Sequence, residues 1–214
     1  MATNTESAQL LHLMAVMSPA FPVGGFAYSH GLEWAIDSGE IDVLNWITSL
    51  VRHGSGWNDA VLFSAAYDAD DAKRLGIDEL ALALAASRER YLETTDLGQS
   101  CVKATSTLAG REALPYTVYP VVLAAYCADM GISKRSSLLA FMQAFSNNLI
   151  AVAVRLVPLG QTRGLEIMGA LMPVILETVD RAMSSTLDDL GSSTFLSDVA
   201  AMKHETQYSR IFRS

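Results

Sequence analysis

The sequence predicts an all-α protein, a single-domain helical bundle of roughly eight to ten helices that spans residues 1–214. Apolar residues recur every three or four positions along most of the chain. No segment shows the sustained alternation of apolar and polar residues that a half-buried strand requires. Hydrophobic residues make up 50% and charged residues 18% of the 214 positions, which is the composition of one domain with a large buried core.

Four apolar stripes at helical spacing place four of the helices. They are, in chain order, Leu10, Leu13, Met14 and Met17; Val43, Ile47 and Leu50; Leu138, Met142, Phe145, Leu149, Val152 and Leu156; and Leu165, Met168, Met172, Ile175, Val179 and Met183. Asp42 and Ser133 precede the second and third stripes, and both are residue types that cap helix N-termini. Pro173 lies inside the fourth stripe and predicts a kink there. The alanine-rich stretches 81–86 and 124–125 also favour helix.

Turn-forming and polar residues predict where the helices are interrupted. The expected breaks are at residues 18–29, 68–78, 111–119, 158–164 and 191–194. None of them is long enough to link two domains, and the chain contains no internal repeat.

Charge and hydropathy exclude several classes of partner. The net charge of −8 disfavours nucleic acid, because phosphate backbones repel an acidic chain. The mean hydropathy of +0.25 is high, but the longest apolar runs, 119–128 and 167–176, are shorter than the roughly 18–20 residues that span a bilayer. The N-terminus has no secretory pattern, and two isolated thiols, Cys101 and Cys127, suit a reducing compartment. We therefore expect a cytoplasmic protein that does not enter a membrane, with its excess apolar surface buried in the fold or against protein partners.

The motifs of common enzymes and metal sites are missing from the sequence. It contains no phosphate-binding loop and no nucleophile elbow. His204-Glu205 begins like a zinc-protease helix, but Tyr208 stands where the second histidine is needed. His30 and Glu33 are three residues apart, so a shared ion and a plain surface pair are both open, with the surface pair favoured. We expect no catalysis, no cofactor and no permanent metal within one chain, while a transient metal site across a dimer stays open.

Two segments have unusual compositions for their positions. Residues 18–34 form a break that carries two prolines, adjacent glycines and the rings of Phe21, Phe26 and Tyr28. Such a loop either tucks its rings into its own core or presents Tyr28 or Ser29 for recognition. The C-terminal tail, residues 204–214, mixes arginine with aromatic and aliphatic residues, as interface hot spots do. The alternative for this tail is that it folds onto its own domain.

These segments carry a resemblance to a known family. The pattern Ser-Pro-x-x-Pro-Val-Gly-x-Phe-x-Tyr-Ser-x-Gly-Leu-Glu is matched in full from Ser18 to Glu33. Further matches lie at 147–148, at 154–162 and over 204–214, and together they make the chain resemble the UreF family of urease accessory proteins. The chain departs from the family in two places. It has Gly164-Leu165 where many members have Gly-Gln, and Tyr119 where many have a histidine, so a role that needs an imidazole there is not carried over.

The resemblance implies a function without chemistry of its own. Proteins of the UreF family are all-helical, tend to form homodimers and have no known catalytic activity. The family bridges the accessory protein UreD, also called UreH, to the GTPase UreG, and the complex then meets apo-urease and helps to deliver nickel. A GTPase partner fits a chain that itself lacks a phosphate-binding loop.

The resemblance also assigns partner-binding residues. One group is expected to become ordered on binding the UreD/UreH-like partner: His204, Glu205, Tyr208, Arg210, Phe212 and Arg213. The other is expected to belong to the surface that the GTPase reads: Tyr28, Ser29, Gly31 and Glu33. Arg155 is a weaker candidate, because a cation at a helix end also stabilises the helix dipole.

Two other functions are weighed against this scaffold. The chain could accelerate GTP hydrolysis by supplying Arg210 or Arg213 in trans to the partner's GTP site. It could also be an unrecognised all-α enzyme with a pocket among its methionine-rich helices, although the missing catalytic motifs disfavour this.

Overall fold

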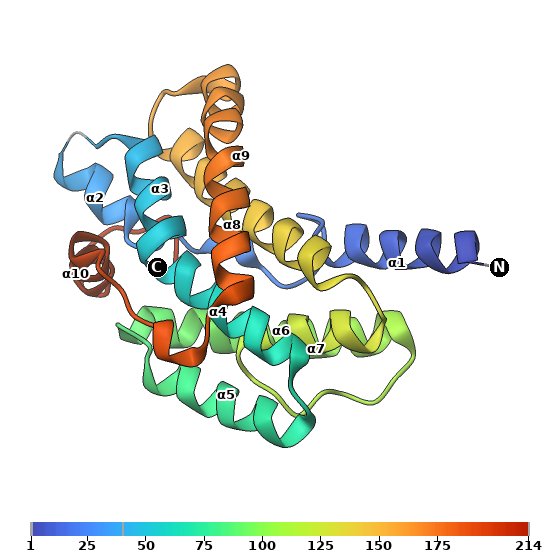
Figure 1. The fold of residues 1–214 in the computed structure, drawn as a ribbon. Coiled ribbons are helices and arrows are strands. Elements are labelled where there is room, and N and C mark those ends of the chain that lie inside the picture. The colour runs from blue at the N-terminus through green and yellow to red at the C-terminus, as the bar shows by residue number, and fades with distance from the viewer. Residues whose placement is uncertain (1, 40, 214) are drawn as a thin grey trace.

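The computed structural model describes residues 2–39 and 41–213 (Figure 1). Within these residues it contains ten α-helices, two short 3-10 helices and no strand, which confirms the predicted all-α class. The elements are α1 (Ala2–Val16), η1 (Gly25–Ala27), α2 (Leu32–Ser38), α3 (Val43–His53), α4 (Ser55–Asp68), α5 (Asp71–Ala83), α6 (Arg88–Ala109), α7 (Tyr119–Asp129), α8 (Lys134–Leu156), α9 (Gly160–Ser184), η2 (Leu187–Asp189) and α10 (Phe195–His204).

The helix ends follow the capping residues of the sequence. Asp42 accepts a hydrogen bond from the backbone N–H of Asn45 (3.1 Å) at the start of α3, and Ser133 caps α8 in the same way, so both predicted caps are confirmed. The expected breaks at 111–119 and 191–194 coincide with the connections before α7 and α10. The expected break at 68–78 is wrong beyond residue 70. Asp70 caps α5 through the N–H of Lys73 (2.9 Å), which lets the polar residues after it continue as helix. The break at 158–164 is likewise shorter, since α9 begins at Gly160.

The core is built around α4, α7 and α8. The stripe predicted for α8 is confirmed, since Leu138, Met142 and Leu149 are fully buried where this helix packs against α4 and α9. By length and apolar composition α8 alone among the described helices could cross a membrane, but more than half of its apolar stretch is buried inside the fold. The hydrophobicity of α8 is therefore that of a central core helix.

The stripe predicted for α9 is only partly correct. Met168, Ile175 and Val179 are buried, whereas Leu165 and Met172 are exposed. The buried side of α9 also includes Gly164, Ile167, Leu171 and Val174. The predicted stripe thus follows the edge of the buried face, because α9 packs on α3, α4 and α8 from one side.

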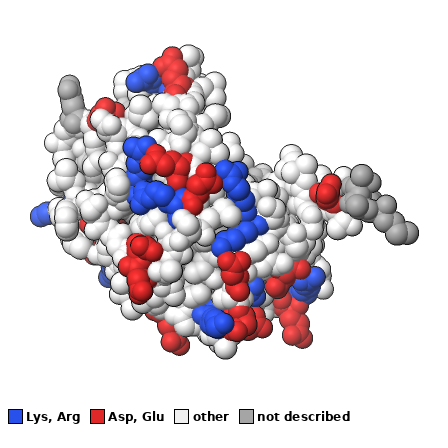
Figure 2. All heavy atoms as spheres, viewed as in Figure 1, with Lys and Arg blue, Asp and Glu red and all other residues white. Residues whose placement is uncertain are grey.

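The surface combines mixed charge with exposed apolar groups. Helix α1 extends away from the body of the bundle at its N-terminal end (Figure 1), and its predicted stripe splits into a buried Leu13 and exposed Leu10 and Met14. On the face drawn in Figure 2, acidic and basic side chains are interspersed among larger uncharged areas. Exposed apolar side chains such as Leu10 and Met14 are of the kind that protein partners cover.

Candidate functional site: the docked C-terminal tail

The motif at residues 28–33 makes a tight turn against which α10 packs. After η1 the backbone enters the left-handed region at His30 (φ 51°) and Gly31 (φ 75°), and α2 begins at Leu32. A Cβ on Gly31 would lie 2.7 Å from the backbone nitrogen of Ala201 and 2.9 Å from the Cβ of Ala200. Glycine is therefore needed at this position both for the turn and for the close approach of α10.

At the end of α10, His204 lies between two carboxylates from distant parts of the chain. Its Nε2 is 3.0 Å from Oε2 of Glu33 on α2, and its Nδ1 is 2.9 Å from Oε1 of Glu89 on α6. The imidazole is 0% exposed. Burial alone lowers the pKa of His204, but the hydrogen bonds to Glu89 and Glu33 and the charges of both carboxylates outweigh it, so the pKa is raised above its usual 6.5.

Glu33 also holds the backbone of the tail. Its Oε1 accepts the N–H of Ile211 (2.7 Å), and its Oε2 accepts the N–H of Phe212 (2.9 Å). These bonds direct the ring of Phe212 into the core, where it is 5% exposed and lies under the guanidinium of Arg155, 5.5 Å from the ring centroid. Arg155, a candidate from sequence, is thus placed against the tail.

A second set of contacts holds the end of the tail. The backbone N–H of Arg213 donates to the carbonyl of Ala27 (2.7 Å), and its guanidinium contacts the hydroxyl of Tyr28 (3.3 Å) and the carboxylate of Asp96 (3.2 Å). Tyr28 itself donates to Asp96 (3.1 Å). On the inner side Arg210 pairs with Glu89 at 3.1 Å. The two segments that the sequence singled out separately are therefore bound to each other.

The structure places the predicted site residues in two groups. Buried beneath the tail or within its contacts are Tyr28, Ser29, Gly31, Glu33, His204 and Phe212. The second group reaches the surface and consists of Tyr208, Arg210 and Arg213. Glu205 is partly exposed, and its carboxylate accepts a hydrogen bond from the backbone N–H of Arg88 (3.0 Å). Ser214, the last residue of the predicted tail, lies outside the described residues.

Of the two alternatives for this loop, the one in which Tyr28 or Ser29 is presented to solvent is wrong for this structure. Tyr28 is 4% exposed because its hydroxyl turns inward to Asp96 under Arg213, and the hydroxyl of Ser29 accepts the N–H of Glu33 (3.3 Å). The ring that does reach the surface from this segment is Phe26, at 59% exposed. The tail follows the second of its two alternatives, since it folds onto its own domain.

The pairing of His30 with Glu33 is also corrected. His30 has a left-handed backbone conformation ahead of α2, so it does not share a helical face with Glu33. Its Nε2 instead lies 2.9 Å from Glu93 of α6. Among the described residues no group of three His, Cys, Asp or Glu side chains could hold a metal ion.

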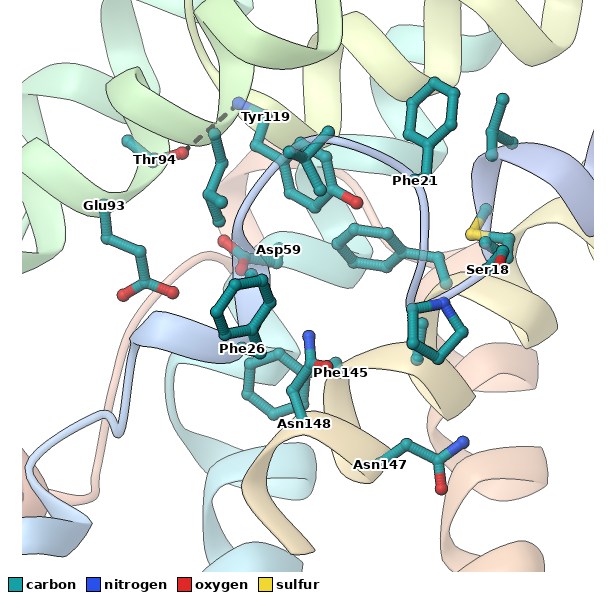
Figure 3. Close-up of a pocket in the computed structure, with 18 of the residues that line it drawn as sticks. Ser18, Phe21, Phe26, Asp59, Glu93, Thr94, Tyr119, Phe145, Asn147 and Asn148 are labelled. Carbon is teal, nitrogen blue, oxygen red and sulfur yellow. Dashed lines mark hydrogen bonds between the residues drawn. The ribbon is translucent and has the colours of Figure 1, made fainter. Parts of the chain in front are cut away.

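A cavity of about 100 Å³ lies between the loop at 18–26, α6, α7 and α8 (Figure 3). Phe21, Phe26 and Tyr119 line it, and in Figure 3 the carboxylate of Asp59 lies between Tyr119 and Phe26. Along its charged side Arg90 pairs with Asp59 (3.2 Å) and with Glu93 (2.7 Å).

Burial and these pairings together shift the pKa values of the cavity's two carboxylates. Burial raises the pKa of Asp59 despite the charge of Arg90. Burial also raises the pKa of Glu93, but the charges and hydrogen bonds of Arg90 and His30 overcome it and bring that pKa down to about 2. Arg90 pairs with both carboxylates and His30 contacts Glu93, so the cluster is a structural ion network that joins α4, α6 and the 28–33 turn.

Sequence reasoning missed the part that α6 plays. Glu89 and Asp96 supply the carboxylates that receive the tail, and Glu93 receives His30. These three acids follow one another at helical spacing in a stretch without a strong apolar stripe, so an ordinary solvated face was the natural expectation. Their spacing was the one available signal.

The amino-acid sequence of this chain matches those of known proteins. A family model named UreF matches residues 38–172. The urease accessory protein UreF of Mesorhizobium japonicum is 48% identical to this chain over the full length of both. That of Ruegeria pomeroyi is 41% identical, also over both full lengths. The urease accessory protein UreF 1 of Brucella canis is 44% identical, over an alignment that covers 99% of this chain and 97% of the Brucella protein.

Proposed function

Because the chain belongs to the UreF family of urease accessory proteins, we propose that it is the scaffold that bridges a UreD/UreH-like protein and the GTPase UreG and promotes nickel insertion into apo-urease. The family is one of non-catalytic accessory proteins, so the chain is not an enzyme. Its action then depends on the surfaces it offers to partners and not on a reactive group.

The docked tail is the observation that carries the proposal. Glu33 and His204 fix the backbone at 204–212, and this fixed backbone leaves Tyr208 fully exposed and Ile211 largely exposed. The preceding helix α10 exposes Phe195 and Leu196. Aromatic, aliphatic and arginine side chains on a backbone that is already ordered suit a binding hot spot, because little conformational entropy is lost on association.

The buried residues of the 28–33 turn contribute indirectly in this proposal. Tyr28, Ser29, Gly31 and Glu33 are covered by the tail or by α10, so they reach a partner through the position of the tail. If both partners require a docked tail, a substitution in this turn would weaken the binding of the UreD-like protein and of the GTPase together.

Co-purification tests the bridging role. The tagged chain is co-expressed with the urease accessory proteins of the same organism, as wild type, as a deletion of 205–214, and as Tyr208→Ala. The matched control is Tyr91→Ala, which removes a half-exposed tyrosine from α6. We expect wild type and control to retain the UreD-like protein and UreG, and the tail variants to lose them. Full recovery of both partners by the deletion variant would refute the role of the tail.

We further propose that the protein works in the cytoplasm as a homodimer. Exposed apolar side chains on α9 support the second point, since Leu165 is 75% exposed and Met172 and Leu176 are also exposed. Light scattering of the purified chain and of Leu165→Glu tests it. The expected result is a dimer that Leu165→Glu weakens, and a monomeric wild type would contradict the proposal.

The alternative in which an arginine stimulates the GTPase stays a separate prediction. Arg210 is held by Glu89 and Arg213 by Asp96, so either ion pair must open before the side chain enters another protein's GTP site. GTP turnover by the purified GTPase with this chain, compared with the chain carrying Arg210→Lys and Arg213→Lys, separates the two roles. A scaffold leaves turnover per GTPase unchanged, whereas an arginine donor raises it and loses the effect in the variant.

A further inference from the structure

A carboxylate at each ring nitrogen favours a doubly protonated imidazole at His204. A neutral imidazole has one N–H and one bare nitrogen, so it donates to a single carboxylate. His204 faces Glu33 on one nitrogen at 3.0 Å and Glu89 on the other at 2.9 Å, and its side chain is wholly buried. With both carboxylates ionised, both nitrogens must carry a proton for both contacts to be attractive.

These two carboxylates are also the ones that hold the tail. Glu33 accepts the backbone N–H groups of Ile211 and Phe212, and Glu89 accepts the guanidinium of Arg210. The imidazolium thus sits between the two anchors of residues 205–213. Losing its proton would turn one contact into a carboxylate facing a lone pair, in a place that water does not reach.

The other charged groups near His204 do not replace its proton. Facing it are Glu33 from α2, Glu89 from α6 and Arg210 from the tail, so the protonated set of four is neutral and the deprotonated set carries one uncompensated negative charge. On its own segment Glu205 turns to the backbone of Arg88, and Lys203 is exposed. On the far side of α6, Arg90 is committed to Asp59 and Glu93.

We infer that His204 is a proton-operated latch: its imidazolium keeps residues 205–213 docked on α2 and α6, and loss of the proton releases them. The latch is a property of this chain alone and goes beyond the proposed bridging of partners. As a consequence, the segment that exposes Tyr208 and Ile211 has one ordered conformation at lower pH and is undocked and flexible at higher pH.

The direction of the pH dependence follows from the raised pKa of His204. In the released tail the imidazole returns toward its unshifted pKa of about 6.5. The equilibrium constant for docking of the tail is then at its highest below about pH 6.5. It falls about tenfold per pH unit as the pH rises toward the raised pKa, and it changes no further above that pKa.

Amide hydrogen exchange of the full chain, without partners, tests the latch. Protection of the Ile211 and Phe212 amides is measured from pH 6 to pH 10 after correction for the intrinsic rate, alongside NMR titration of the His204 ring. In wild type we expect protection to fall about tenfold per pH unit from about pH 6.5 up to the titration midpoint of the docked His204 ring, and to level off above that midpoint. Protection that stays constant between about pH 6.5 and the midpoint of the ring titration would overturn the inference.

Variants separate a latch from a merely structural contact. Glu89→Gln removes one carboxylate but leaves an amide that can donate to a bare nitrogen, so the pKa of His204 and the midpoint of release should both move to lower pH. His204→Gln should abolish the pH dependence. His53→Gln, which changes an exposed histidine on α3, should leave the wild-type profile intact.

An unshifted midpoint in Glu89→Gln, or a wild-type profile in His204→Gln, would refute the latch. If either variant does not fold, the wild-type titration decides. Because no partner is present, failure of the latch leaves the bridging proposal untouched, and failure of the co-purification leaves the latch untouched.

Discussion

Replacing Gly31 by alanine should separate α10 and the tail from the body of the protein. The new Cβ would lie 2.7 Å from the backbone nitrogen of Ala201 and 3.0 Å from the carbonyl carbon of Ala200. Ordinary contact distances are about 3.5 Å or more, so α10 must retreat by several tenths of an ångström, and backbone cannot yield as a flexible side chain does. His204 ends this helix, so the same movement lengthens its contacts with Glu33 and Glu89.

The expected cost has two parts that a matched control separates. An alanine at φ 75° costs about 1–2 kcal/mol for the left-handed conformation alone. Overpacking against α10 adds about 1–3 kcal/mol. Gly24→Ala has the same backbone cost (φ 83°), but its Cβ would have no described atom within 4 Å. The difference between the two variants therefore measures the contact with α10.

Urea unfolding of the isolated chain, with hydrogen exchange of the tail amides, provides the assay. We expect Gly31→Ala to lower the free energy of unfolding by about 1–3 kcal/mol more than Gly24→Ala, and to lose protection at Ile211 and Phe212. Equal destabilisation by the two variants, with the tail still protected, would show that the close approach of α10 to the turn does not fix the tail.

Two further predictions concern the tail and the charge cluster. Phe212→Ala should make the tail sensitive to carboxypeptidase, because it removes the buried ring that holds the tail and a terminal segment undocks locally before the core opens. Ile211→Ala, at an exposed position, is the control, and equal proteolysis of the two would contradict this. Arg90→Gln should destabilise the fold by about 3–5 kcal/mol in urea, since it leaves the buried Asp59 and Glu93 without their cation. Because the pKa of Glu93 is lowered to about 2, its contribution to the free energy of unfolding is present above the unfolded value of about 4.5 and is lost as the pH falls toward 2. Arg90→Gln should therefore unfold at higher pH than wild type in an acid titration. An unchanged midpoint would show that this pair does not stabilise the fold.

Much of the fold could be read from local pattern. The caps at Asp42 and Ser133 and the buried stripe of α8 are confirmed because capping and helical periodicity act within a few residues. Local pattern failed where a distant neighbour decides the outcome. In α9 the side that packs on α3, α4 and α8 leaves Leu165 and Met172 exposed, although their spacing matches that of buried residues.

The candidate site was predicted as residues but not as an arrangement. The 28–33 turn and the tail were both identified from sequence, yet they were assigned to two separate surfaces. The structure joins them through Glu33 and His204, which are 171 positions apart, and through Glu89, which the sequence did not single out. Long-range pairs of this kind produce no periodic pattern in the sequence, since each partner looks like an ordinary charged residue among its neighbours along the chain.

The helical class, the helix caps, the family and the missing catalytic motifs can be read from the linear sequence, because propensity, capping and motif matching depend on neighbours along the chain. The docked tail, the burial of Tyr28 and Ser29 and the two carboxylates around His204 depend on tertiary contacts that the linear sequence does not reveal. Burial and charge pairing are fixed when α2, α6 and α10 come together, and the pKa of His204 is raised only by the carboxylates that this packing places beside it.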